Sequence, residues 1–292
     1  MSTYLFAHGW LDERRRLEGL QQVLDSSTFR HLAATGVGSG WRCLEVGGGA
    51  GSVAEWLCER VDGHGSVVVT DLDTGFLDKL GLPNLEVRRH DIVADDLEEG
   101  AFDLIHSRLV LEHLRGRDAA LARMAKALAP GGWLVVEDFE WTPVTVLSAR
   151  PDRHVQRVSR MLPAVLRLAV GLMGAAGYDP HFGGRLPAEL ARLGLVDVTA
   201  EGRAVHIRGG SPEADFGRLT VTRFRDLIEH PPEAVGDGRP WTVPGALRRS
   251  ESLRRVALRA IDELTALLDD PAVFCRAPLL VTAMGRRPAA IP

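Results

Sequence analysis

Four residues with the chemistry of a ligand-binding turn lie close together near the start of the chain: Glu45, Gly47, Gly49 and Gly51. Apolar residues before them predict a buried strand over residues 41–46, and residues 52–59 read as a helix. Glycine reaches positive φ without strain and lets a ligand approach the backbone closely. A strand, a glycine turn and a helix N-terminus together indicate a site for a nucleotide-type ligand.

A second acid follows at the distance that such a site requires. Residues 66–71 predict a strand that ends in Asp71, about twenty residues beyond the glycine turn. The carboxylate of Asp71 is then placed to accept hydrogen bonds from the hydroxyls of a ribose.

Two ligand classes fit these residues. Gly49, Gly51 and Ala54 match the dinucleotide fingerprint G-x-G-x-x-G/A, which leaves an NAD-dependent oxidoreductase as an alternative. The spacing Glu45-x-Gly47-x-Gly49-x-Gly51 instead resembles the first motif of class I S-adenosylmethionine (SAM)-dependent methyltransferases. The acid discriminates between them, because a carboxylate repels a pyrophosphate but attracts the ammonium and sulfonium groups of SAM. The resemblance therefore implies SAM as cofactor and S-adenosylhomocysteine as product.

The resemblance extends over about residues 40–140. Asp91 and Ile92 stand where the family binds adenine, and the run Leu-Ala-Pro-Gly-Gly-Trp-Leu at 128–134 is typical of the family's turn before the fifth strand. One departure is Gly48, where a cysteine is common. The resemblance implies the following cofactor-binding residues: Glu45, Gly47, Gly49, Gly51, Asp71, Leu72, Asp91, Ile92 and Ser107.

Methyl transfer needs a base only where the attacking group starts protonated, and such a base contributes ~10²–10⁴-fold. The candidates selected from the sequence are His106 and Asp138, at the ends of the fourth and fifth predicted strands, and His181, in a predicted lid. His113, Glu137 and His154 are further candidates. Positioning alone is the alternative. Histidine, cysteine and carboxylate residues show no metal-ligand spacing, so no metal is expected.

Strands and helices alternate along the first half of the chain, which predicts an α/β fold: a Rossmann-like, mostly parallel seven-stranded sheet with helices on both faces, plus a helical insert or lid. The predicted strands cover residues 41–46, 66–71, 85–90, 102–107, 133–138, 196–207 and 278–284, and the predicted helices residues 52–59, 117–128, 152–177, 186–193, 213–229 and 248–268.

We divide the chain into an N-terminal helical cap (1–40), a SAM-binding core (41–140), a helical lid (141–185) and the rest of the core sheet with a helical insertion (186–292). Tyr4, Phe6 and Trp10 suggest that the cap folds over the cofactor. The glycines of residues 178–184 are read as a hinge of the lid, and the acceptor is expected between the fourth and fifth strand ends and the helix over 152–177.

Composition narrows the partners. A formal net charge of −4 over 292 residues argues against nucleic acid, and no apolar run approaches the ~20 residues of a membrane span. Cys43, Cys58 and Cys275 form no paired framework, and no signal peptide precedes them, so a cytoplasmic location is expected. A homodimer is possible.

The expected substrate is a small hydrophobic or aromatic molecule of the secondary-metabolite type. A SAM-fold protein that catalyses a non-methylating reaction, such as a cyclisation, is a further alternative.

Overall fold

The computed structural model describes residues 11–142, 145–150, 153–230 and 251–289. The backbone divides into two compact units. One contains residues 24–140, 180–203 and 280–292, and the other contains residues 1–23, 141–179 and 204–279. Each unit is described by itself below. The four-part division predicted from the sequence stays a prediction.

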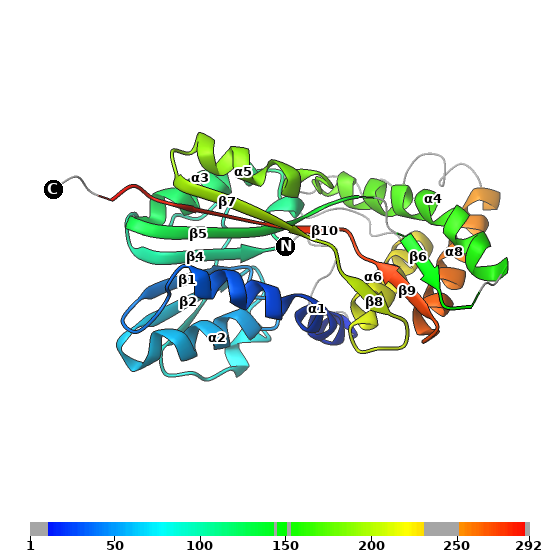
Figure 1. Ribbon diagram of the computed structural model, residues 1–292, viewed down its shortest axis with the longest axis horizontal. Helices are drawn as coiled ribbons and strands as arrows, with labels where there is room; N and C mark the ends of the chain where they lie inside the picture. Colours follow the sequence, from blue (N-terminus) through cyan, green and yellow to red (C-terminus); the bar gives the residue numbers. More distant parts are fainter. Residues whose placement is uncertain (1–10, 143–144, 151–152, 231–250, 290–292) are drawn as a thin grey trace. The chain divides into compact units, whose positions relative to one another are not determined.

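The first unit is built on a seven-stranded sheet with the strand order β3-β2-β1-β4-β5-β10-β7 (Figure 1). Its strands are β1 (Arg42–Val46), β2 (Ser66–Asp71), β3 (Leu85–Arg89), β4 (Phe102–Arg108), β5 (Leu128–Glu140), β7 (Val196–Arg203) and β10 (Leu279–Arg286). The pairs among β1 to β5 are parallel, whereas β10 and β7 are antiparallel. This confirms the predicted Rossmann-like, mostly parallel sheet.

Helices cover both faces of this sheet because its strands are apolar on both sides. Leu44 and Ile105 face α3 (Arg117–Ala127) and α5 (Phe182–Arg192) in one core. Cys43 and Leu104 face α2 (Ser52–Val61) and the second half of α1 (Glu13–Ala34) in another. Neighbouring residues of a strand therefore point to opposite faces. Three short 3-10 helices complete the unit: η1 (Asp62–His64), η2 (Leu77–Lys79) and η3 (Leu111–His113).

β5 begins five residues earlier than the sequence predicts. Leu128 already pairs with Phe102, and the register then shifts between Phe102 and Leu104. Gly131 has a φ of 81°, and a Cβ on Gly132 would lie 2.8 Å from the Phe102 carbonyl oxygen. The predicted turn at 129–132 is therefore an irregular opening of the strand that only glycine fits.

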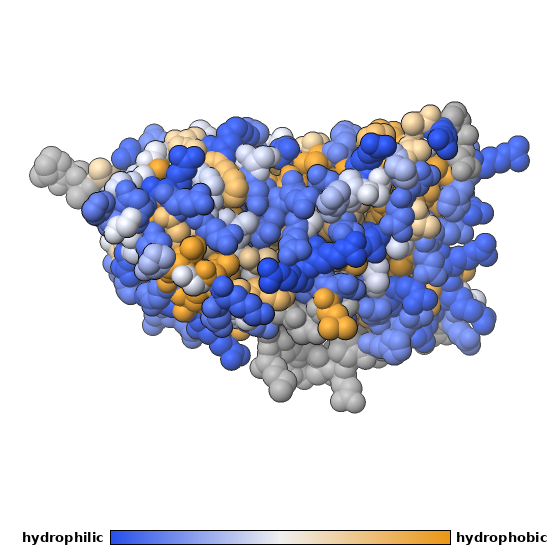
Figure 2. Space-filling view, turned by 90° about the horizontal axis from the view of Figure 1, so that it is seen from below, coloured by the Kyte–Doolittle hydropathy of each residue, from blue (hydrophilic) through white to orange (hydrophobic). Residues whose placement is uncertain are grey.

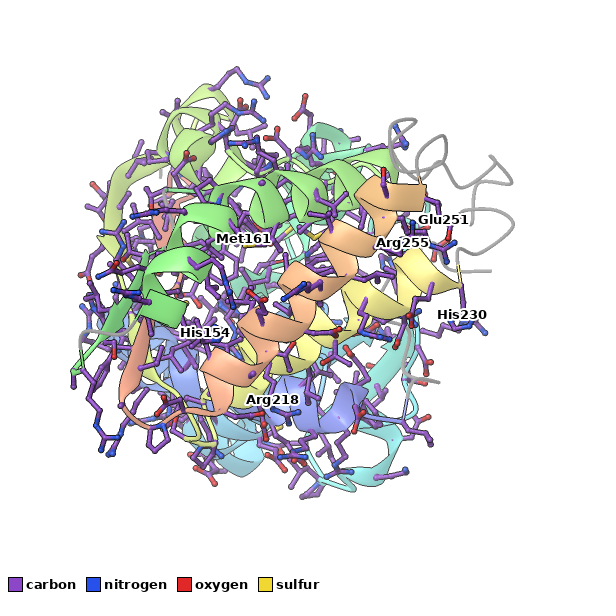
Figure 3. All side chains as sticks on the ribbon, turned by 90° about the vertical axis from the view of Figure 1, so that its right-hand side faces the viewer. His154, Met161, Arg218, His230, Glu251 and Arg255 are labelled. Carbon is purple, nitrogen blue, oxygen red and sulfur yellow. The ribbon has the colours of Figure 1, made fainter. Side chains whose placement is uncertain are left out.

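The second unit contains a small antiparallel sheet and helices. Its strands are β6 (Thr145–Ser148), β9 (Val273–Arg276) and β8 (His206–Arg208), in that order. Its helices are α4 (Arg153–Ala175), α6 (Ala214–Glu229) and α8 (Glu251–Asp269). Figure 3 shows α8 lying between α4 and α6. The apolar faces of these helices form two cores, and one of the cores also contains Val146 and Val273 of the small sheet.

Two expectations are corrected here. The single strand predicted over 196–207 is two strands, β7 and β8, that belong to different sheets. β6 and β9 were not predicted. A strand's hydrophobic pattern gives its faces but not its neighbours, so a continuous β-prone run cannot show a change of sheet.

Parts of other predictions lie outside the described residues: Tyr4, Phe6 and Trp10 of the cap, residue 152, and residues 248–250. Within the ranges that the structure describes, no helix is both long and apolar enough to cross a bilayer. On the face drawn in Figure 2, hydrophilic residues predominate and hydrophobic residues form small separate groups.

Candidate functional site

The glycine turn after β1 combines positive φ angles with close packing against neighbouring side chains. Gly47, Gly49 and Gly51 have φ values of 79°, 56° and 98°. A Cβ on Gly47 would lie 2.2 Å from Val110 Cγ2, and one on Gly51 would lie 2.7 Å from Leu80 Cδ1. Both the conformation and the close packing exclude side chains at Gly47 and Gly51, so the turn before α2 requires glycine.

Asp71 stands at the end of β2 beside this turn. Its Oδ2 accepts the Gly49 N–H at 3.1 Å, and its Oδ1 accepts the Asp73 N–H at 3.2 Å. The side chain is half-buried, as is Leu72 after it. Asp71 therefore braces the glycine turn, a role that the sequence did not suggest, in addition to its predicted contact with a ribose.

Asp91 follows β3 and forms a tight local turn. Its Oδ1 accepts the Val93 N–H at 2.9 Å, and its own N–H donates to Asp95 Oδ2 at 2.8 Å. Ile92 is buried in the core under α3. Their predicted contacts with adenine stay predictions.

Ser107 and Asp138 occupy the carboxyl ends of β4 and β5 and are both buried. Among the described residues, Ser107 Oγ and Asp138 Oδ2 have no hydrogen-bond partner. Asp138 Oδ1 accepts the Glu112 N–H at 3.4 Å. Burial raises the pKa of Asp138 well above its usual range, so its neutral form is favoured. Buried polar atoms without partners call for a water or a ligand.

Glu45 and His106 point to the opposite face of the sheet and bind each other. His106 Nδ1 lies 2.6 Å from Glu45 Oε2, and His106 Nε2 lies 3.5 Å from Glu137 Oε2. All three side chains are at most 3% exposed. A carboxylate only accepts hydrogen bonds, so two carboxylates facing one ring favour the doubly protonated imidazolium. Glu45 thus directs its carboxylate to His106 beneath the glycine turn.

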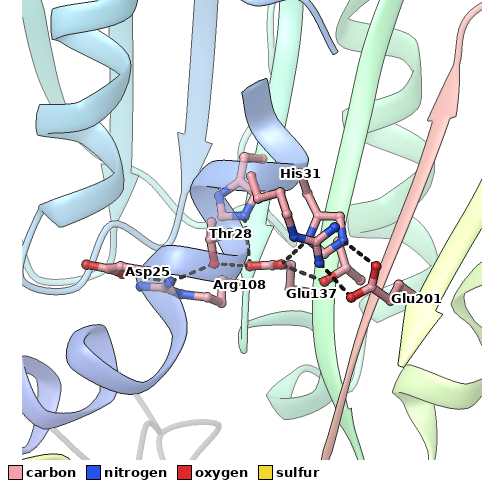
Figure 4. A network of polar contacts seen from close by, with 9 residues as sticks. Asp25, Thr28, His31, Arg108, Glu137 and Glu201 are labelled. Carbon is pink, nitrogen blue, oxygen red and sulfur yellow. Dashed lines mark hydrogen bonds and ion pairs between the residues drawn. The ribbon is translucent and has the colours of Figure 1, made fainter. Parts of the chain in front are cut away.

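The Glu137 carboxylate joins this pair to two further elements. Thr28 of α1 donates to Oε2 at 2.5 Å, and Thr282 of β10 donates to Oε1 at 2.7 Å. Arg108 donates to Thr28 Oγ1 and to Asp25 Oδ1, each at 2.9 Å. Figure 4 shows these contacts, with His31 between Glu137 and Glu201. The network fastens the second half of α1 to the sheet.

The charges of this network stabilise one another. Burial alone would lower the pKa of His106, but Glu45 and Glu137 raise it to about 9. Burial likewise opposes ionisation of Glu137, yet His106 and Arg108 lower its pKa to about 2. For Glu45, burial outweighs the attraction of His106, and the pKa is raised. His106 is therefore a resident buried cation.

His181 lies in a different environment. Its Nδ1 is 2.6 Å from Glu140 Oε1, and its side chain is 64% exposed. It is the N-cap residue of α5, and Glu140 is the last residue of β5. In a β-α-β unit a helix begins near the carboxyl end of the strand before it, where open α/β sheets bind ligands.

The predicted hinge is wrong. Gly183 and Gly184 lie in the first turn of α5 rather than in a loop. A Cβ on Gly183 would lie 2.5 Å from the Asp138 carbonyl oxygen, and one on Gly184 would lie 2.6 Å from Glu140 Oε2. Neither glycine has a positive φ, so both serve close packing against β5 rather than movement.

The structure thus separates the sequence-selected residues into groups. Asp71 contacts the glycine turn, and Glu45 contacts His106. Ser107 and Asp138 lie on the opposite face of the sheet from Glu45 and His106. Glu140 was missed, although it closes the acidic run Glu137-Asp138-Phe139-Glu140 after an apolar strand. Among the described residues, no three histidine, cysteine or carboxylate side chains gather as a metal site.

Comparison with known proteins identifies the family. A model described as a methyltransferase domain matches residues 44–134, which contain the glycine turn, Asp71, Asp91 and Ser107. Residues 44–134 are therefore a methyltransferase domain of the class I SAM-dependent type. The match confirms the resemblance drawn from Glu45 to Gly51 and supports SAM as the cofactor.

Curated relatives of this chain include Methyltransferase str2 of Strobilurus tenacellus, 28% identical over 67% of this chain and 66% of that protein. Another is the ubiquinone/menaquinone biosynthesis C-methyltransferase UbiE of Francisella philomiragia, 30% identical over 47% of this chain and 56% of that protein. The match thus spans less than two thirds of these relatives' own length.

Solved structures share the fold. A putative methyltransferase from Bacillus halodurans aligns with a TM-score of 0.52 and 14% identity, covering 90% of this chain and all of that one. The [4+2]-cyclase SpnF aligns with a TM-score of 0.50 and 17% identity, covering 92% of this chain and 83% of that one. At these identities the likeness extends to the fold alone.

The residues of the methyltransferase domain fit SAM. The glycine turn has the motif and the positive φ angles expected of the loop that holds SAM in this family. Asp71 presents a half-buried carboxylate at the end of β2, and Ser107 Oγ is a buried hydroxyl without a partner among the described residues. When bound, SAM supplies a methyl group activated by its sulfonium.

Proposed function

We propose that this protein transfers the methyl group of SAM to a small hydrophobic or aromatic molecule. The observation that carries the proposal is the methyltransferase match over residues 44–134, which coincides with the glycine turn and the acid at the end of β2. One relative supports the substrate class, since UbiE is named for ubiquinone and menaquinone biosynthesis.

Within the site we assign holding of the cofactor to the backbone of Gly47, Gly49 and Gly51 and to the carboxylate of Asp71. Asp91, Ile92, Leu72 and Ser107 complete the cofactor set as the family resemblance implies. Glu45 supports the cofactor site indirectly, because its carboxylate pairs with His106. Gly47 and Gly48 donate their N–H groups to the Thr70 carbonyl at 2.8 and 3.0 Å, which steadies the turn.

We assign the base, where the acceptor starts protonated, to His181 and not to His106. Both ring nitrogens of His106 face carboxylates and its side chain is fully buried, so a substrate proton has no access to it. The His181 ring is 64% exposed at the edge where β5 ends. Asp138 is buried with a raised pKa, which suits a hydrogen-bond donor better than a base.

Product mass tests the proposal. The purified protein is titrated with SAM and with NAD in a calorimeter, then incubated with SAM and a library of hydroxylated aromatic compounds. Binding of SAM, release of S-adenosylhomocysteine and a product heavier by one methyl group are expected. Binding of NAD alone would contradict the cofactor. An altered product with SAM unconsumed would favour a cyclisation-type reaction, for which the fold of SpnF offers a precedent.

A homodimer and a secondary-metabolite pathway stay predictions.

A further inference from the structure

Glu140 contacts two groups at the start of α5. Its Oε1 lies 2.6 Å from His181 Nδ1, and it accepts the Gly184 N–H through Oε2 at 3.1 Å. The Glu140 side chain is 24% exposed and that of His181 is 64% exposed. One carboxylate therefore satisfies an otherwise open N–H of the first helical turn and also holds the histidine before it.

The local sequence is shaped to admit this carboxylate. A Cβ on Gly184 would lie 2.6 Å from Glu140 Oε2, so a side chain at this position would displace the carboxylate. A Cβ on Gly183 would collide with the backbone of Asp138 and Phe139 at 2.5 to 2.8 Å. Without these two glycines α5 could not begin so close to β5, and Glu140 could not reach both partners.

The contact fixes where the proton of the neutral ring resides. A carboxylate accepts hydrogen bonds but donates none, so His181 Nδ1 carries the hydrogen that faces Glu140. In the neutral ring Nε2 then carries the lone pair. This is the arrangement in which a carboxylate orients a histidine for proton abstraction.

We infer that Glu140 is a positioning residue that holds His181 with Nε2 as the proton acceptor for the methyl acceptor. The inference rests on the proposed function and deepens it, because it specifies acceptors that lose a proton as the methyl group arrives, such as the hydroxyl of a hydroxyarene. The sulfur–methyl bond breaks with its electron pair left on sulfur, the oxygen–methyl bond forms, and the hydroxyl proton goes to Nε2.

Nitrogen NMR of the histidine rings tests the inference without an acceptor. The protein is labelled with ¹⁵N-histidine, and the His181 signals are assigned by their loss in His181→Gln. In the natural protein the neutral His181 ring is expected to carry its proton on Nδ1. The opposite assignment would overturn the inference.

Glu140→Gln separates positioning from helix capping. The amide oxygen of the variant still accepts the Gly184 N–H, but its NH₂ group donates to Nδ1. The proton of His181 should therefore move to Nε2, and turnover should lose part of the ~10²–10⁴-fold that a base contributes, with SAM affinity unchanged. The matched control is Glu189→Gln, which removes the partner of the exposed Arg192 on the same helix and should change neither quantity.

The outcomes distinguish this inference from the proposed function. If the tautomer fails to change in Glu140→Gln, or if it changes while turnover of an acceptor identified by mass stays at the natural level, the inference is overturned and methyl transfer stands. If SAM is not used at all, the proposed function fails, and the tautomer shift still decides whether Glu140 sets the proton of His181.

Discussion

Two histidine–glutamate pairs lie in the unit built on the seven-stranded sheet. They have the same nitrogen–oxygen distance but differ in their exposure to solvent. His106 to Glu45 and His181 to Glu140 each join Nδ1 to a carboxylate oxygen at 2.6 Å. The first pair is at most 3% exposed and lies beneath the second half of α1, whereas the His181 side chain is 64% exposed at the start of α5. The distance between the two side chains therefore does not distinguish the buried pair from the pair for which we propose a chemical role.

The difference lies in the second ring nitrogen. His106 Nε2 faces Glu137, so the ring is held between two carboxylates and keeps its charge. His181 is held by the carboxylate of Glu140 through Nδ1 and its ring reaches solvent. Removal of one partner from the buried group would leave an uncompensated charge in the interior, whereas the ring of His181 is open to solvent.

The largest expected effect separates the two pairs by stability. His106→Ala leaves Glu45 and Glu137 buried without their cation and should lower the free energy of unfolding by ~3–5 kcal/mol. His181→Ala removes an exposed pair and should cost less than about 1 kcal/mol. Urea unfolding followed by circular dichroism measures both.

His106→Gln guards against a variant that does not fold, because its amide still donates to one carboxylate. Its expected stability lies between those of the natural protein and His106→Ala. Equal losses for His106→Ala and His181→Ala would mean that burial does not distinguish the pairs.

The second effect is a pH dependence of stability to which the buried pair contributes. With a folded pKa of about 9 against 6.5 unfolded, His106 contributes stability that is full below pH 6.5 and is lost as the pH rises through about 9. The loss should approach ~3 kcal/mol. Glu137, with a pKa of about 2 against 4.5, contributes above pH 4.5 and loses its contribution as the pH falls through about 2.

Urea midpoints measured across the alkaline range test this expectation. The natural protein and His181→Ala should lose stability in parallel as the pH rises through about 9, whereas His106→Gln should show a flatter profile. The raised pKa values of Glu45 and Asp138 act in the same direction, since burial penalises their ionised forms. An alkaline loss that persists undiminished in His106→Gln would assign it to these acids instead.

The sequence predicted the sheet well because its strands carry their own signal. The bounds of β2 match the prediction, and those of β1, β3 and β4 differ by one residue, since apolar runs between turn residues define buried strands. The glycine turn was also predictable from local sequence, because closely spaced glycines indicate backbone positions with positive φ.

The partners of the site residues could not be predicted in this way. Glu45 and His106 are 61 positions apart, and Glu140 and His181 are 41 apart. Their meeting depends on the register of neighbouring strands and on where α5 begins, neither of which a hydrophobic pattern contains. The small sheet of β6, β9 and β8 was missed because its strands are short and distant in sequence.

A third, smaller effect concerns the attachment of α1. Thr28 donates to Glu137 and accepts from Arg108, so Thr28→Val leaves both charged groups without one hydrogen bond. The expected loss of unfolding free energy is ~1–3 kcal/mol. Thr74→Val is the matched control, because Thr74 donates to Asp78 at the surface, and its effect should be near zero. Similar losses for the two variants in urea would contradict a network that acts through burial.

The smallest expected effect on stability concerns Gly184, which packs against the Glu140 carboxylate of the exposed pair. Gly184→Ala gains the ~0.5–1 kcal/mol by which alanine favours a helix over glycine, but its Cβ would meet Glu140 Oε2 at 2.6 Å. The carboxylate end is flexible and can move aside, so the gain and the displacement should nearly cancel. The matched control is Gly217→Ala in the first turn of α6, where the nearest atom, Leu268 Cδ1, lies at an ordinary 3.8 Å and the gain should be kept.

The same variant should release His181 from Glu140, so the proton on Nδ1 should become mobile between the two ring nitrogens in the ¹⁵N spectrum while the fold is unchanged. The buried pair offers no such separation, because any change at His106 that moves its proton also removes a cation from between Glu45 and Glu137. If Gly184→Ala raises stability as much as Gly217→Ala and leaves the His181 proton on Nδ1, the glycine is not what seats the carboxylate, and the exposed pair would be held by other contacts of α5.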